Sequence, residues 1–352
     1  MPDTVIRNAT IIDGTGAPRF VGDVSIEDGH IAEIGEISSS VVDLEVDATD
    51  LVLAPGFVDV HTHDDGALMQ HPDMTFKVSQ GCTSVVVGNC GFSAIPAVTG
   101  ESTLDLSGVE ASWNDLDGYR DAVEGSNPAV NAMMLVGHNT IRTLEMKGER
   151  GAPNDRQLLR MREHVELAMQ QGACGFSTGL IYRPGRWADT EEVLDLAKVV
   201  APFGGIYATH MRNENDHLLE AVDEALHIGA EAGIAVQISH HKAAGRRNWG
   251  KVTESLAKVD AAVAQGARVT LDVYPYTAGS GPMVQYFDIN NPDPELAQVI
   301  QLASCPAFRG YEGRMIIDIA SELDMSASET VQHILTAPEG KQTICIQHVM
   351  DE

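Results

Sequence analysis

Short apolar segments separated by turn residues make up the first part of the chain. Val24–Ile26 and Ile31–Ile34, for example, lie next to Asp28-Gly29 and Gly35. Short β-branched runs between such turns are typical of β-strands. Residues 1–53 are therefore predicted to form a small β domain.

From about Leu51 onward, apolar β-branched runs alternate with amphipathic stretches. The predicted strands are 51–60, 83–87, 132–136, 175–177, 205–208, 236–239 and 268–274. The predicted helices include 155–171, 190–200, 216–232 and 251–265, and apolar residues in 216–232 recur at helical spacing. Strands that are apolar on both faces and alternate with helices predict a parallel sheet covered on both sides.

The number of strand–helix units indicates a barrel-like fold over residues 54–352. Roughly seven units are visible, one fewer than the eight of a (β/α)8 barrel. A segment rich in Gly, Asp, Asn and Pro, at about 278–310, is interpreted as an inserted excursion. The tail from Met315 is expected to contain one amphipathic helix and a short strand, Thr343–Ile346.

Composition and charge exclude several classes of partner. The 352 residues are 43% hydrophobic, which suits a folded soluble protein. A formal net charge of -28 disfavours binding to nucleic acid or to anionic membranes. We find no apolar stretch of about 18 residues, which a membrane-spanning helix would need.

Cysteine usage and the N-terminus predict a cytoplasmic protein. The five cysteines are odd in number and widely spaced, which does not indicate a disulfide framework and fits a reducing compartment. The chain starts Met-Pro-Asp-Thr, without a basic region followed by an apolar run, so we expect no signal peptide.

Histidine or cysteine follows most of the predicted strands. The ends of these strands carry His61 and His63, then Cys90, His138, His210 and His240. In a barrel the carboxyl ends of the strands line the active site, and imidazole and thiolate are the ligands that zinc prefers. His61 and His63 are two residues apart, so in a strand they would face the same side. The pattern predicts a zinc site in which the metal activates water for hydrolysis.

Several of these residues have a second interpretation. Cys90 alone would more often be a small core residue, but its position beside the other candidates favours a ligand. His240 is preferred to His241, because neighbours in a strand point in opposite directions. His138 is equally compatible with a substrate contact and with a role behind the ligands. Lys242 fits either a carboxylate-binding group or an exposed salt bridge.

Six longer motifs carry a resemblance to a known family. The opening Ala54-Pro-Gly-Phe-Val-Asp-Val-His-Thr-His resembles the amidohydrolase superfamily. The further motifs resemble the N-acyl-D-amino-acid deacylase (D-aminoacylase) family, and this resemblance extends from residue 4 to the last residue. These motifs are Gly88-Asn-Cys-Gly-Phe-Ser, Gly175-Phe-Ser-Thr-Gly-Leu-Ile-Tyr-Arg-Pro-Gly, Thr209-His-Met-Arg-Asn-Glu, Ile238-Ser-His-His-Lys-Ala-Ala-Gly and Asp272-Val-Tyr-Pro-Tyr-Thr-Ala.

The resemblance implies a fold, an activity and a set of ligands. The fold would be a (β/α)8 barrel with a small β-sandwich built from both ends of the chain, to which residues 1–53 would contribute. The activity would be zinc-dependent hydrolysis of N-acyl-D-amino acids. The resemblance assigns a tight zinc to Cys90, His210 and His240, and a weaker second metal to His61 and His63 with Cys90 between them. It assigns contacts with the small-molecule substrate to Lys242, Tyr182 and Ser280.

One feature of the family is missing from the sequence. The family has an aspartate after the eighth strand, in a Ser-Asp-Gly setting, which shuttles the catalytic proton. This chain has no such motif, and Asp351 is expected to lie upstream of that strand. The catalytic proton-transfer residue is therefore not assigned, and we expect a barrel that lacks its C-terminal part.

The sequence is also compatible with two alternative functions. A cyclic-amide hydrolase of the dihydroorotase or hydantoinase kind usually has a metal-bridging lysine on the fourth strand, and Gly175-Phe-Ser-Thr-Gly has none. The other alternative is a truncated, non-catalytic homologue that still binds metal. The sequence also leaves open whether the substrate side chain is neutral or acidic, and the oligomeric state.

Overall fold

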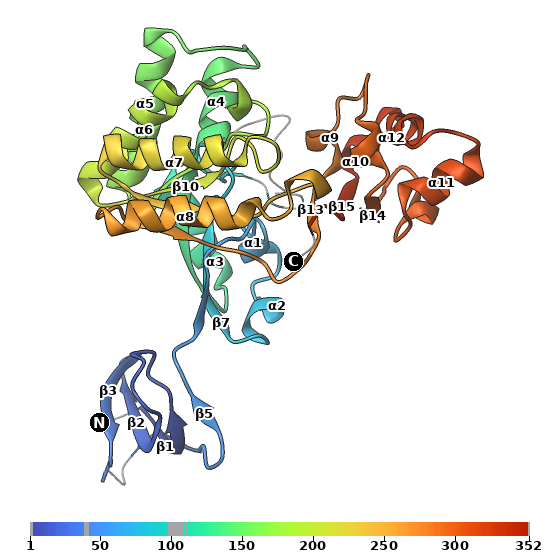
Figure 1. The fold of residues 1–352 in the computed structure, drawn as a ribbon. Helices are drawn as coiled ribbons and strands as arrows, with labels where there is room; N and C mark the ends of the chain where they lie inside the picture. Colours follow the sequence, from blue (N-terminus) through green and yellow to red (C-terminus); the bar gives the residue numbers. More distant parts are fainter. Residues whose placement is uncertain (1–2, 39–41, 98–108, 110, 351–352) are drawn as a thin grey trace. The chain divides into compact units, whose positions relative to one another are not determined.

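The structure is a computed structural model that describes residues 3–38, 42–97, 109 and 111–350 (Figure 1). The chain divides into two compact units. One contains Met1–Val58 and Phe76–Ser84, and the other contains Asp59–Thr75 and Val85–Glu352.

The first unit is built on a small sheet. Its strands are β1 (Thr4–Ile11), β2 (Phe20–Glu27), β3 (His30–Gly35), β4 (Leu44–Asp47) and β5 (Val52–Leu53). The order is β3-β2-β1-β4, with β5 also beside β1, and β1 is antiparallel to β2 but parallel to β4 and β5. Ala9, Ile11, Val24 and Ala48 form its small core. This is the small sheet domain expected from the sequence.

A second sheet follows the chain order of its seven strands. They are β6 (Phe57–Asp59), β7 (Cys82–Val87), β8 (Asn131–Gly137), β9 (Gly175–Gly179), β10 (Ile206–His210), β11 (Ala235–Ile238) and β12 (Val269–Leu271). Successive pairs from β8 to β12 are parallel. The carboxyl ends of these strands therefore meet at one edge of the sheet, and residues that follow them lie close together.

Helices connect these strands, and the last five of the long ones pack against one another in chain order (Figure 1). The long ones are α3 (Leu116–Ser126), α4 (His138–Met146), α5 (Asp155–Gln170), α6 (Thr190–Val200), α7 (Leu218–Ala232) and α8 (Lys251–Ala264). Asn154 starts α5 with a capping box shared with Gln157, and Asp189 starts α6 by accepting a hydrogen bond from the Glu192 backbone. The apolar faces of these helices and the buried strand residues, such as Phe176 and Tyr207, form the main core.

The last part of the chain forms a smaller sheet with its own core. The order is β13-β15-β14, all antiparallel, and the core includes Met283, Ile300 and Cys345. The strands are β13 (Gly279–Pro282), β14 (Ile300–Ser304) and β15 (Ile344–Gln347), and the helices are α9 (Met283–Tyr286), α10 (Pro294–Ala297), α11 (Ile316–Leu323) and α12 (Ala327–Thr336).

The prediction of one helix in this tail is wrong, because the chain forms two. Asp324 ends α11 with a left-handed φ of 55°, and Ser326 then begins α12 with a capping box to Glu329. The predicted excursion also contains short elements of its own, β13, α9, α10 and β14.

The remaining helical segments are short. They are α1 (Ala67–Gln70), α2 (Thr75–Val78) and the 3-10 turns Gly185–Trp187, Ala201–Phe203, Arg246–Asn248, Arg309–Tyr311 and Gly340–Gln342. Within the described ranges, no helix is both long and apolar enough to cross a membrane. A parallel sheet with alternating helices, together with a small separate sheet, confirms the predicted α/β class.

Candidate metal centre and adjoining cavity

Four candidate ligands lie at the carboxyl edge of the parallel sheet. His61 comes shortly after β6, Cys90 follows β7, His210 is the last residue of β10, and His240 follows β11. The Cys90 sulfur lies 3.3 Å from Nε2 of His61, 3.7 Å from Nδ1 of His210 and 3.5 Å from Nε2 of His240. The structure thus gathers these four predicted residues around one sulfur atom.

These spacings match the donor set of a metal. One thiol has a single proton and cannot donate hydrogen bonds to three nitrogens at once. In a tetrahedral site with Zn–S near 2.3 Å and Zn–N near 2.0–2.1 Å, sulfur and nitrogen ligands lie about 3.5 Å apart. The buried thiol and imidazoles therefore fit a zinc ion by both chemistry and spacing.

The electrostatics of the cluster favour the thiolate. Burial raises the pKa of the Cys90 thiol, but His61, His210 and His240 outweigh burial and hold this pKa well below its ordinary value of 9.0. Burial lowers the pKa of His61, but Cys90 and Asp272 outweigh it and raise this pKa to about 10. The thiolate is the form of cysteine that binds metal, and metal binding would release the imidazole proton.

The loop that carries Cys90 has an unusual backbone. Cys90 has a φ of 54°, and Gly88 and Gly91 have φ values of 79° and 78°. A Cβ at Gly88 would lie 2.0 Å from the Leu135 carbonyl oxygen, so no side chain fits there. A buried non-glycine residue in the left-handed region persists only where the surrounding structure holds it, and such residues cluster at functional sites.

Asp65 anchors the loop that carries Cys90. Its buried carboxylate accepts hydrogen bonds from the backbone nitrogens of Gly88 and Ala94, at 3.2 Å each. The Tyr119 hydroxyl donates to the Asp65 carbonyl oxygen. Burial raises the pKa of Asp65 to about 6, although both backbone hydrogen bonds oppose this shift. Asp65 therefore braces the loop on which Cys90 sits.

His63 lies apart from the four clustered ligands. It is exposed, and the centre of its ring is 5.7 Å from that of His61. The groups of described residues that could hold a metal are His61, Cys90 and His240, and His210, Glu214 and His240. A second metal on His61 and His63 therefore stays a prediction.

Two carboxylates that the sequence reasoning did not select lie beside the histidines. Glu214 is buried, with Oε1 3.0 Å from Nδ1 of His240 and Oε2 3.4 Å from Nε2 of His210. Asp272 follows β12, accepts a 2.6 Å hydrogen bond from the His240 backbone nitrogen and lies 3.5 Å from Nδ1 of His61.

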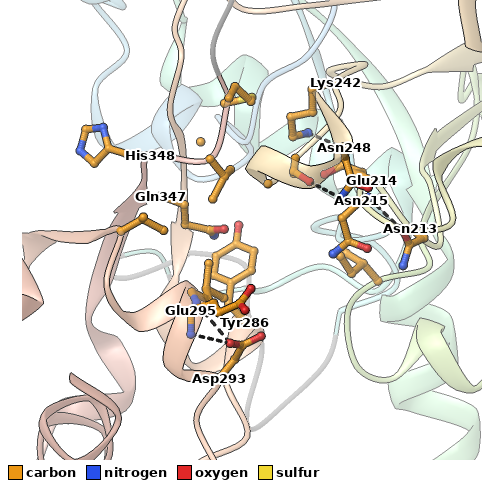
Figure 2. A pocket seen from close by; sticks show the side chains of 18 of the residues that line it. Asn213, Glu214, Asn215, Lys242, Asn248, Tyr286, Asp293, Glu295, Gln347 and His348 are labelled. Carbon is orange, nitrogen blue, oxygen red and sulfur yellow. Dashed lines mark hydrogen bonds and ion pairs between the residues drawn. The ribbon is translucent and has the colours of Figure 1, made fainter. Parts of the chain in front are cut away.

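A cavity of about 1240 Å³ adjoins the cluster, and its wall includes His210 and His240. The three residues predicted to contact substrate, Lys242, Tyr182 and Ser280, also line it. Figure 2 shows Lys242 and Glu214 on one wall and Tyr286 on another. The cavity therefore connects the predicted substrate contacts with the candidate ligands.

Three residues on the wall contact one another or the cluster. The Tyr182 ring packs edge-on against His210 with 4.5 Å between ring centres, and its hydroxyl is 3.5 Å from that of Tyr286. Lys242 donates a 2.5 Å hydrogen bond to Glu214. This ion pair is largely buried, so the alternative of an exposed salt bridge at Lys242 does not apply.

Two other histidines considered from the sequence point elsewhere. Nε2 of His241 is 2.9 Å from the Ser255 hydroxyl. His138 is fully buried and lies 2.8 Å from Glu192, which also pairs with Arg142. His138 therefore belongs to an ion cluster between α4 and α6. Asp351 lies outside the described residues.

Comparison with known proteins identifies the class. The sequence profile Amidohydro_3, described as amidohydrolase family, matches residues 44–308. The chain is 38% identical to D-aminoacylase of Alcaligenes xylosoxydans xylosoxydans over 99% of its own length and 70% of that protein. The chain belongs to the amidohydrolase family.

Further matches narrow its position in that family. The chain is 42% identical to the N-acyl-D-glutamate deacylase of the same organism, over 79% of its own length and 58% of that protein. It also matches the crystal structure of N-acyl-D-glutamate deacylase from Bordetella bronchiseptica, complexed with zinc and a phosphonate inhibitor, with a TM-score of 0.90 and 36% identity over 99% of this chain and 72% of that one. Within the amidohydrolases it therefore groups with the N-acyl-D-amino-acid deacylases, which confirms the resemblance found in its motifs.

Proposed function

We propose that this chain is a zinc-dependent hydrolase that cleaves N-acyl-D-amino acids to a carboxylate and a free D-amino acid. The observation that carries the proposal is the gathering of three imidazole nitrogens around the Cys90 sulfur, at the spacing of zinc ligands. The family supports the substrate class, since two of its relatives are named D-aminoacylase and N-acyl-D-glutamate deacylase.

In this proposal Cys90, His210 and His240 hold the principal zinc. His61, which also contacts Cys90, belongs with His63 to a weaker second site, and the exposure of His63 is in keeping with lower affinity. Zinc, when bound, supplies a Lewis acid for the amide carbonyl and lowers the pKa of bound water. The chain provides a buried, charge-compensated set of donors at one end of a cavity.

The cavity residues bind and orient the substrate. Lys242 carries the positive charge that would pair with the substrate carboxylate, and Ser280, which also lines the cavity, offers a hydroxyl. Burial, with Tyr286 and Cys90, raises the pKa of Tyr182 well above 10.0. Tyr182 therefore remains a neutral phenol that can donate a hydrogen bond beside His210.

We place the protein in the cytoplasm. All five cysteines are free, and Cys90 would be lost as a ligand if it were oxidised. This location agrees with the odd number and wide spacing of the cysteines in the sequence.

The experiment that tests the proposed function is amine release from matched N-acetyl-D- and N-acetyl-L-amino acids. The panel contains neutral, glutamate and aspartate side chains, plus a cyclic amide, and the purified chain is supplied with zinc. D-selective release that disappears in Cys90→Ala supports the proposal. Hydrolysis of the cyclic amide alone would favour the alternative hydrolase, and zinc binding without any turnover would indicate a non-catalytic metal-binding chain.

A further inference from the structure

Glu214 contacts three functional side chains with one buried carboxylate. Oε1 lies 3.0 Å from Nδ1 of His240 and 2.5 Å from the Lys242 ammonium, and Oε2 lies 3.4 Å from Nε2 of His210. Its side chain is only 8% exposed, so water screens these charges only weakly (Figure 2). One residue therefore touches two candidate zinc ligands and the predicted substrate-binding lysine.

The contacts at His240 restrict where its proton can be. The nitrogen that faces Cys90 is Nε2, and it can bind a metal only without a proton. In the neutral ring the proton then sits on Nδ1 and needs an acceptor. The Lys242 nitrogen lies 2.8 Å from Nδ1 but is only a donor, whereas Glu214 can accept.

Lys242 therefore competes with the metal-binding form of His240. If the ammonium donated to Nδ1, the ring proton would move to Nε2, the nitrogen that faces Cys90. Glu214 opposes this in two ways. Its charged Oε1 lies 3.0 Å from Nδ1 and favours a proton there, and Lys242 can instead donate to Glu214 and to the His240 carbonyl oxygen at 2.9 Å. His210 presents its other face, with Nδ1 toward Cys90 and Nε2 toward Glu214.

We propose that Glu214 is a positioning residue that selects the zinc-binding tautomer of His240, orients His210 by its charge and restrains Lys242 from blocking the site. This inference rests on the proposed function only in taking zinc as the metal. Carboxylates that hold the second nitrogen of a ligand histidine typically contribute about 10–100-fold to metal affinity.

The test measures zinc affinity by competition with a chelating dye in four variants of the full chain. We expect Glu214→Gln to weaken zinc binding about 10–100-fold. The double variant Glu214→Gln with Lys242→Met should bind zinc at least about three-fold more tightly than Glu214→Gln alone, because the competing donor is gone. Such non-additivity is expected of residues in contact. A purely structural role for Glu214 would not produce this recovery.

The matched control is Glu145→Gln. Glu145 is also a largely buried carboxylate that pairs with an arginine and a histidine, Arg160 and His164, but it lies on α4 away from the cluster. Zinc affinity should be unchanged in this variant. The absorption spectrum of the cobalt-substituted protein gives a second readout, and it should change in Glu214→Gln and not in Glu145→Gln.

Three results would overturn the inference. They are wild-type zinc affinity in Glu214→Gln, a double variant that binds zinc no better than the single one, and absence of zinc binding by the wild type. If Glu214→Gln does not fold, the single variant Lys242→Met tests the inference. We expect its zinc affinity to equal or exceed that of the wild type, and a ten-fold loss would refute the competition between Lys242 and the metal for His240. All these readouts are independent of turnover, so failure of D-selective hydrolysis would leave a positive result intact.

Discussion

Cys90 is the residue on which the candidate site depends, because its sulfur contacts all three clustered imidazoles. Cys90→Ser should reduce zinc affinity by more than about 100-fold, since even residues behind the ligands contribute 10–100-fold. Zinc content after dialysis, measured by atomic emission, checks this. Cys174→Ser is the control, because Cys174 donates to the Met134 carbonyl oxygen instead. Retention of stoichiometric zinc by Cys90→Ser would contradict the assignment.

Gly88 gives a second prediction at the scale of single residues, and Gly204 is its matched control. Both have left-handed φ values, 79° and 72°, but no described atom lies within 4 Å of a Cβ at Gly204. Gly204→Ala should therefore cost only the conformational penalty, about 1–2 kcal/mol. Gly88→Ala should cost more and also weaken zinc binding, because the new methyl group must displace the Cys90 loop.

Urea unfolding of both glycine variants, together with zinc titration, separates the two effects. Equal losses of stability with unchanged zinc affinity would mean that the tight backbone approach at Gly88 does not position Cys90.

The histidines show how far the sequence could predict the site. His61, Cys90, His210 and His240 were found because they follow strands, and parallel strands bring such residues to one edge. His63 was paired with His61 by the two-residue period of a strand, but β6 ends at Asp59, so that period no longer holds. Glu214 was missed because it lies in the loop beyond β10, where sequence spacing does not reveal side-chain direction.

At the scale of elements, Glu192 on α6 joins α4 through His138 and Arg142. Removal of one partner from a buried ion cluster leaves uncompensated charge, so Glu192→Gln should lower the free energy of unfolding by about 3–5 kcal/mol. Glu191→Gln is the control, because Glu191 is exposed in the same first turn of α6. Urea denaturation measures both, and similar small losses would exclude a stabilising role for the cluster.

Glu192 also predicts how the free energy of unfolding depends on pH. Burial raises the pKa of Glu192, but His138 and Arg142 outweigh burial, and the net pKa lies below its ordinary value of 4.5. A carboxyl group with a lowered folded-state pKa stabilises the protein fully above the unfolded pKa, and this stabilisation is lost as the pH falls. The stability difference between wild type and Glu192→Gln should thus be constant above about pH 5 and shrink below pH 4.5. A constant difference down to pH 3 would be evidence against this.

Elements with local signals were predicted well. Helix α6 was predicted at its observed bounds, and α5 within one residue, since caps and helical periodicity are local. The β13 strand, Gly279–Pro282, has no strand pattern and forms only because it pairs with β15, more than sixty residues later. The break between α11 and α12 was overlooked, although Ser326 and Glu329 have the spacing of a capping box.

At the scale of the whole molecule, the net charge of -28 opposes the compact state. Salt screens this repulsion, so raising NaCl from about 0.02 M to about 0.5 M should increase Tm, by about 1–2 °C for each kcal/mol of repulsion relieved in a chain of 352 residues. Scanning calorimetry at fixed zinc concentration measures this, with sucrose of equal osmolarity as the control. An unchanged Tm would show that the acidic groups are compensated by local pairing.

The order of the parallel sheet has a consequence for the time course of folding. The strands pair in chain order, yet Cys90 and His240 are 150 residues apart and become neighbours only when β7 to β11 are assembled. The complete ligand set cannot exist in a partly folded chain, so zinc cannot act as a nucleus and should bind late. Bound zinc should then slow unfolding while leaving the refolding rate unchanged, because its contacts are absent from the transition state.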